Sequence, residues 1–133
     1  MCEIAIKTSL HQGEYEIGIW GTRAEFANLT EPFTGLSRRV FLLKLLPEPY
    51  YPVPMQQVVV EPVVHSNGVV TVQIDGSDFT LSGDAQAFLK LTAFLESLSN
   101  LSTGEHWHLD WFDNEDLLAP ATANMSFVFY IEG

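Results

Sequence analysis

Residues 69–98 read VVTVQIDGSDFTLSGDAQAFLKLTAFLESL, and this stretch decides the fold. It opens with a β-rich run, turns at Asp75-Gly76 and continues as a second strand through Phe79-Thr80-Leu81. The apolar spacing then becomes helical over residues 84–98, with Ser82 or Asp84 as the N-cap. The positions predicted to face the core are Ala87, Phe88, Leu91, Phe94, Leu95 and Leu98. Strands that lead directly into a helix predict an α+β domain.

Further strands are predicted on both sides of this stretch. Residues 56–64 are β-rich, and the segment His65-Ser66-Asn67-Gly68 predicts a hairpin with residues 69–74, because Asn-Gly is a strong hairpin signal. A second hairpin is predicted around Gln12-Gly13. The other predicted strands are residues 39–46, 105–112 and 126–131. Residues 47–54 contain four prolines and predict an extended loop.

A short helix is predicted near the N-terminus. Thr22 and Glu25 have the spacing of a capping box, and Pro32 ends the helix after about Leu29. The whole chain, residues 1–133, is therefore expected to form a single α+β domain. Its expected architecture is a mainly antiparallel sheet with one long and one short helix packed on one face.

The starts of the two helices have similar sequences. Gly21, Phe26 and Leu29 have the same spacing as Gly83, Phe88 and Leu91. A duplicated strand-helix unit would explain this echo, and so would the limited set of residues that can begin a helix.

Composition indicates a folded chain in a reducing compartment. Hydrophobic residues make up 47% of the sequence and charged residues 17%, which supplies enough apolar material for a core. Cys2 is the only cysteine, so an internal disulfide is excluded. The N-terminus has no signal-peptide pattern, and the most apolar run, residues 40–46, is too short to span a membrane. We therefore expect a cytoplasmic protein without a membrane segment.

The negative charge is confined to one part of the chain. Acids and bases balance up to Lys44, and the formal net charge of −11 comes from the residues after it, where Lys90 is the only base. This field repels phosphate backbones, which argues against direct nucleic-acid binding, and attracts a basic protein partner. Acidity that serves only solubility is the alternative interpretation.

The most unusual segment reads EHWHLDW, from Glu105 to Trp111. In a strand, His106, His108 and Asp110 share one face, and Trp107, Leu109 and Trp111 share the other. Two imidazoles and a carboxylate are suitable ligands for zinc, so one hypothesis is a metal-binding protein or metal-dependent enzyme that uses His106 and His108, with Asp110 as a further ligand. The alternative is a half-buried strand whose polar face meets a partner, and on that interpretation no cofactor is expected.

An acidic loop follows this strand directly. Asp113, Glu115 and Asp116 add three negative charges next to Asp110. Together with Trp107 and Trp111 they predict an anionic binding surface edged by aromatic side chains, which often act as anchors at interfaces. No nucleophile elbow, phosphate-binding loop, HExxH or dinucleotide fingerprint is present, so we expect that the protein is not an enzyme.

Residues 70–131 resemble a family of small bacterial immunity proteins from polymorphic toxin systems. The resemblance rests on Ile74-Asp75-Gly76, the helix that follows Gly83, the final apolar strand and, most specifically, the Gly-x-His-x-His-Leu-Asp string at residues 104–110. It implies an α+β fold and neutralisation of a toxin by direct contact, without a cofactor. His106, His108 and Asp110 match the string, and their contact with a toxin is a hypothesis. A third hypothesis is an acidic inhibitor of phage type that occupies a nucleic-acid-binding site.

Overall fold

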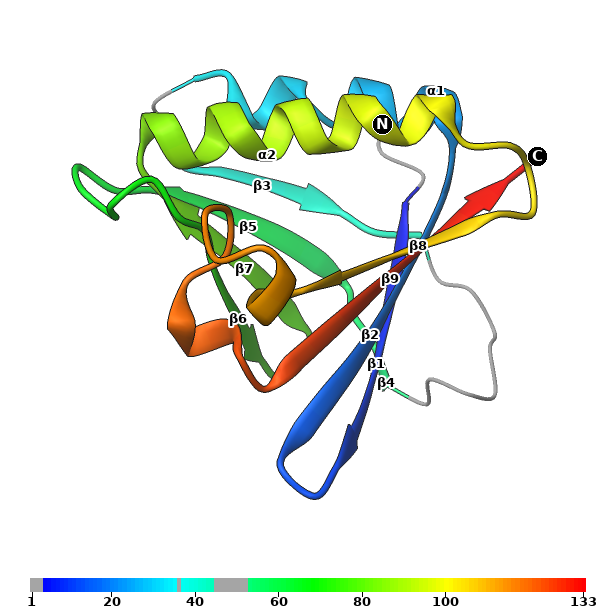
Figure 1. Ribbon diagram of the computed structural model, residues 1–133, viewed down its shortest axis with the longest axis horizontal. Helices are drawn as coiled ribbons and strands as arrows, with labels where there is room; N and C mark the ends of the chain where they lie inside the picture. The colour runs from blue at the N-terminus through cyan, green and yellow to red at the C-terminus, as the bar shows by residue number, and fades with distance from the viewer. Residues whose placement is uncertain (1–3, 36, 45–52) are drawn as a thin grey trace.

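The computed structural model describes residues 4–35, 37–44 and 53–133, which form two β-sheets and two α-helices (Figure 1). The first sheet has the strand order β4-β1-β2-β9-β8, and the second has the order β3-β5-β7-β6. The strands of the first sheet are β1 (Ala5–His11), β2 (Glu14–Thr22), β4 (Val53–Pro54), β8 (His106–Asp110) and β9 (Met125–Glu132). Those of the second are β3 (Arg39–Leu42), β5 (Gln57–Pro62), β6 (Thr71–Asp75) and β7 (Asp78–Gly83).

The helices are α1 (Arg23–Asn28) and α2 (Ala85–Ser97), accompanied by the 3₁₀ turns η1 (Glu31–Phe33), η2 (Leu98–Asn100), η3 (Trp111–Asp113) and η4 (Pro120–Thr122). Figure 1 shows α2 along one side of the molecule, with α1 beside its C-terminal end. Strand pairs are antiparallel except β2 with β9 and β5 with β7. The α+β class and the mostly antiparallel pairing are thus confirmed, but the strands form two sheets where one was expected. Within the described ranges, no helix is long and apolar enough to cross a membrane.

The local signals near the N-terminus are confirmed. Gln12 and Gly13 both have positive φ, 53° and 81°, and connect β1 to β2 in a tight hairpin. The capping box is present in both directions, because Thr22 Oγ1 accepts from the Glu25 amide at 3.1 Å and Glu25 Oε1 accepts from the Thr22 amide at 2.8 Å. Cys2 and residues 45–52, which contain the end of a predicted strand and most of the proline-rich loop, lie outside the described residues.

The predicted hairpin between residues 56–64 and 69–74 is wrong. Strand β5 pairs with β3 and, in parallel, with β7, whereas β6 pairs with β7 through the Gly76 turn. Asn67 and Gly68 do form a turn with positive φ, 58° and 73°, but this turn carries the chain across to the opposite edge of the sheet. The reason is that the turn is bound to the start of α2.

Asp84 makes this connection. One carboxylate oxygen, Oδ1, accepts from the Ala87 amide at 2.8 Å as the N-cap of α2. The other, Oδ2, accepts from the amides of Ser66 at 2.9 Å and Gly68 at 3.1 Å. These backbone donors, that of Ser66 first and then that of Ala87, lower the pKa of the Asp84 carboxyl from 3.8 to about 2. A charged Asp84 therefore fixes both the helix start and the turn.

We expect the Asp84→Asn variant to be less stable than the wild type at pH 7, with a difference that shrinks on acidification. A carboxyl whose pKa is lower in the folded state stabilises that state above its unfolded pKa. This stabilisation is lost as the pH falls from about 4 through about 2, where the wild-type carboxyl takes up its proton. Urea unfolding of both proteins between pH 7 and pH 2 measures this difference, and a difference that does not vary with pH would contradict the assignment.

The similar helix starts have a shared local cause. A Cβ on Gly21 would lie 2.3 Å from Ile4 Cδ1 and 3.3 Å from the Phe26 ring, and one on Gly83 would lie 3.1 Å from the Phe88 ring. In both cases the glycine leaves room for the phenylalanine five residues later to fold back under the end of the strand. Packing at the helix start is sufficient to account for the echo, whether or not the two units arose by duplication.

Candidate functional site

Strand β8 lies at one edge of the five-stranded sheet, and its histidines point away from the core. The rings of His106 and His108 are 5.2 Å apart, and His106 is 5.9 Å from Tyr130 on the neighbouring strand β9. Tyr130 in turn stacks on Trp20 of β2 at 4.9 Å, with the ring planes 10° apart. A row of rings therefore crosses the outer face of the sheet and ends at the exposed imidazoles of β8.

The two tryptophans of the segment differ from the prediction. Trp107 pairs with Phe129 and lies on the core-facing side of β8, yet it is 50% exposed, because β8 is an edge strand and little covers it. Trp111 lies beyond the end of the strand, in η3, and packs against the core. Its indole N–H is buried, with no acceptor among the described residues. Only Leu109 is fully in the core, at 3% exposed.

The acidic loop after β8 is held by backbone contacts at both ends. Asn114 Nδ2 donates to the Asp110 carbonyl at 2.9 Å, and the Val70 amide donates to the Leu117 carbonyl at 2.7 Å. Lys90 from α2 donates to the carbonyl of Asp116 at 2.8 Å and to that of Gly68 at 3.1 Å. The backbone is fixed in this way, while the side chains of Asp113, Glu115 and Asp116 remain exposed. The part of the loop that is held in place is therefore its backbone, from which these carboxylates project.

A hollow of about 270 Å³ extends this loop onto the sheet. Glu14 and Glu16 of β2 line it together with Asp110 and Phe112, and Phe112 is 66% exposed. Neither glutamate was predicted from the sequence to belong to the site. Their register across β9 places Glu16 and Asp110 on either side of Ser126, an arrangement that depends on the parallel pairing of β2 with β9.

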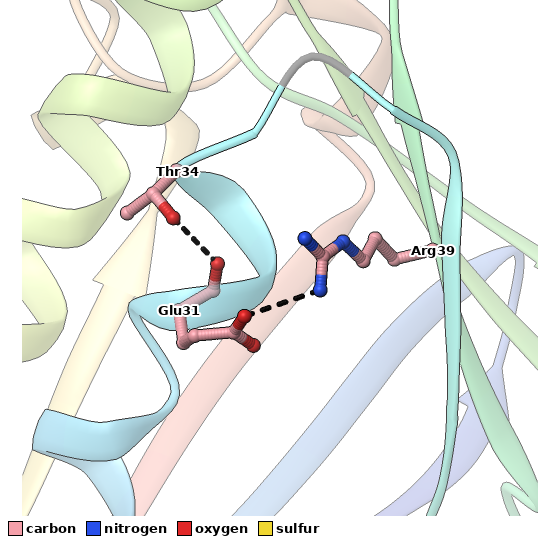
Figure 2. Close-up of polar contacts among 3 residues, drawn as sticks. All are labelled: Glu31, Thr34 and Arg39. Atoms are coloured by element: carbon pink, nitrogen blue, oxygen red, sulfur yellow. Dashed lines mark hydrogen bonds and ion pairs between the residues drawn. The ribbon is translucent and has the colours of Figure 1, made fainter.

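We call the six carboxylates of this region the acidic surface: Glu14, Glu16, Asp110, Asp113, Glu115 and Asp116. Two arginines of the N-terminal half are paired with carboxylates outside the acidic surface. Arg39 pairs with Glu31 of η1 at 3.1 Å, an ion pair drawn in Figure 2, and Arg38 pairs with Glu61 at 2.8 Å. The Lys90 ammonium, by contrast, lies beside the acidic surface, on the Asp116 carbonyl.

The metal hypothesis has too few ligands at this site. His106 and His108 are adjacent, but across residues 4–35, 37–44 and 53–133 no three His, Cys, Asp or Glu side chains are grouped to hold a metal ion. A zinc ion requires three or four protein ligands. The two imidazoles would need ligands from a partner or from outside the described residues.

A pocket of about 60 Å³ lies among the core side chains. Its lining is entirely apolar, and includes Val58, Val72, Leu91 and Phe129. A cavity without polar groups gives water no hydrogen-bond partners and stays dry. It offers neither a nucleophile nor a general base.

Comparison of the chain with models of protein families, with curated proteins and with solved structures gave no match. The functional interpretation therefore depends on the site itself and on the resemblance of its histidine string.

Proposed function

We propose that this protein neutralises a basic toxin by direct protein-protein contact, acting in the cytoplasm as a small immunity protein. The observation that carries the proposal is the acidic surface, three of whose carboxylates, Glu14, Glu16 and Asp110, line one hollow with the exposed side chain of Phe112. Trp107, half exposed, lies on the other face of the same edge strand. Aromatic anchors within a charged surround are typical of protein interfaces. The match of His106, His108 and Asp110 to the immunity-protein string supports the same interpretation.

Charge favours a protein partner over a nucleic acid. The acidic surface repels phosphates and attracts a surface built to bind them, such as that of a nuclease. A catalytic role has no support from the described cavities or side-chain groups. The protein is therefore proposed to act by occupying its partner, without a cofactor and without turning over a substrate.

Co-expression with the neighbouring gene of the source genome tests this function. The neighbouring product is expected to be basic, to stop growth when expressed alone, and to be harmless when this protein is present. The complex should dissociate as salt is raised, because its charges become screened. If no neighbouring product is toxic, or if growth stays arrested although both proteins are made, the proposed function is wrong.

A further inference from the structure

Strand β8 is an edge strand, so the backbone groups on its outer side do not pair with another strand of the sheet. The chain enters the strand through a bulge at Gly104, φ 91°, whose amide donates to the Ile131 carbonyl at 2.8 Å. The Ile131 amide donates to the Glu105 carbonyl at 3.0 Å. The Glu105 carbonyl therefore faces β9, while the Glu105 amide donates to the Ser102 carbonyl at 3.0 Å.

Antiparallel pairing alternates along a strand, so the backbone direction of the following residues is determined. Trp107 and Leu109 direct their amides and carbonyls toward β9, the side that the Glu105 carbonyl also faces. His106, His108 and Asp110 direct theirs away from the sheet. The Asp110 carbonyl accepts from Asn114 Nδ2 at 2.9 Å, which agrees with its outward direction. The backbone amides and carbonyls of His106 and His108 are then the outward groups of β8 that are available to an added strand.

We propose that β8 is extended by an added strand, and that the strand is an extended Lys- or Arg-bearing segment of the basic partner. The inference rests on the proposed function and specifies how the partner is held. Backbone hydrogen bonds to His106 and His108 would provide affinity. Trp107 on one side of the added strand and the acidic surface at its end would select a basic, partly apolar segment.

The other sheet edges are less suitable for such a segment. Strand β4 has two residues, one of them Pro54, and short strands with proline are typical of protected edges. Strand β6 is preceded by Val70, whose backbone bonds to Leu117 and Ala119 hold residues 117–119 beside the start of this edge. Strand β3 begins at Arg39, next to Arg38, and lacks the acidic surroundings that would attract a basic strand, since both arginines are paired with glutamates. Among the described edges, β8 is the one that lies next to the acidic surface.

The test uses an eight-residue peptide of alternating lysine and valine as the probe, with the full-length protein. The variant His108→Pro removes an outward amide and leaves the β8–β9 ladder intact, since proline is tolerated on edge strands. His108→Thr also removes the imidazole but keeps the amide. We expect His108→Pro to bind the peptide about 10-fold more weakly than His108→Thr. Amide hydrogen exchange at His106 and His108 of the wild type should slow when peptide is added, and this second measurement does not depend on the folding of a variant.

The outcomes distinguish failure of strand addition at β8 from failure of the proposed function. Equal binding by His108→Pro and His108→Thr, with unchanged exchange at His106 and His108, overturns strand addition. The proposed function stands in that case if peptide binding is still abolished by changing four acids to their amides, namely Asp110, Asp113, Glu115 and Asp116. Absence of peptide binding by the wild type overturns strand addition by a basic segment, and the proposed function is then decided by the co-expression experiment alone. Exchange protection that rises with protein concentration alone identifies a second copy of the chain as the occupant and overturns the basic segment.

Discussion

Replacing the four carboxylates at Asp110, Asp113, Glu115 and Asp116 by their amides is expected to slow association with a basic partner by about 10-fold or more at low salt. Three of these side chains are exposed on a loop with a fixed backbone, and the fourth lines the adjoining hollow. On the proposed function, they contribute to the long-range field that would steer a basic protein toward β8. Stopped-flow association at several salt concentrations measures both the rate and its salt dependence, and the variant should show a flatter dependence.

A charge-matched control separates this local effect from net charge. Four acids on the other sheet and on the helix are replaced by amides in the same way, namely Glu61, Asp75, Asp78 and Glu96. This control should keep most of the wild-type association rate. If both variants slow association equally, the overall charge of the chain is responsible and the acidic surface has no special role.

Phe88→Ala is expected to destabilise the fold by about 3–5 kcal/mol, a large part of the total stability of a typical domain. The Phe88 ring is 2% exposed and lies edge-on to Phe33 at 5.2 Å, so its removal leaves a cavity between α2 and η1. Leu89, the next residue of the helix, is 71% exposed. Leu89→Ala should therefore cost less than about 1 kcal/mol.

Urea unfolding of the two variants beside the wild type provides the comparison. A linear extrapolation of the unfolding free energy gives the loss for each, and both variants should keep the wild-type dependence on urea concentration. Similar losses for Phe88→Ala and Leu89→Ala would contradict the placement of α2, because the helix would then present a different face to the core.

The local elements were predictable from the sequence because their signals are local. The apolar spacing of residues 84–98 predicted α2, which the structure places at Ala85–Ser97 with Asp84 as its N-cap. Thr22 and Glu25 likewise bond to each other's backbone as their spacing predicted. Such signals involve residues a few positions apart, and tertiary packing left them unchanged.

Pairing between distant segments was not predictable in this way. The turn at Asn67-Gly68 has the positive φ values of a hairpin turn, but the strands before and after it do not pair with each other. The Asp84 carboxylate binds this turn to the start of α2, and the strand that follows, β6, pairs with β7. The contribution of Glu14 and Glu16 to the acidic surface depends on the parallel pairing of β2 with β9. The half-exposed position of Trp107 depends on β8 being an edge strand. Each of these facts becomes visible only once the strand order is known.

Chemical-shift mapping of the complex with the toxic partner tests the central claim most directly. Amide resonances of the isotope-labelled protein are compared before and after the partner is added. The account predicts that the largest changes fall on residues 105–116 and on Glu14 and Glu16. Changes concentrated on β3, β5, β7 and β6, with residues 105–116 unaffected, would contradict it.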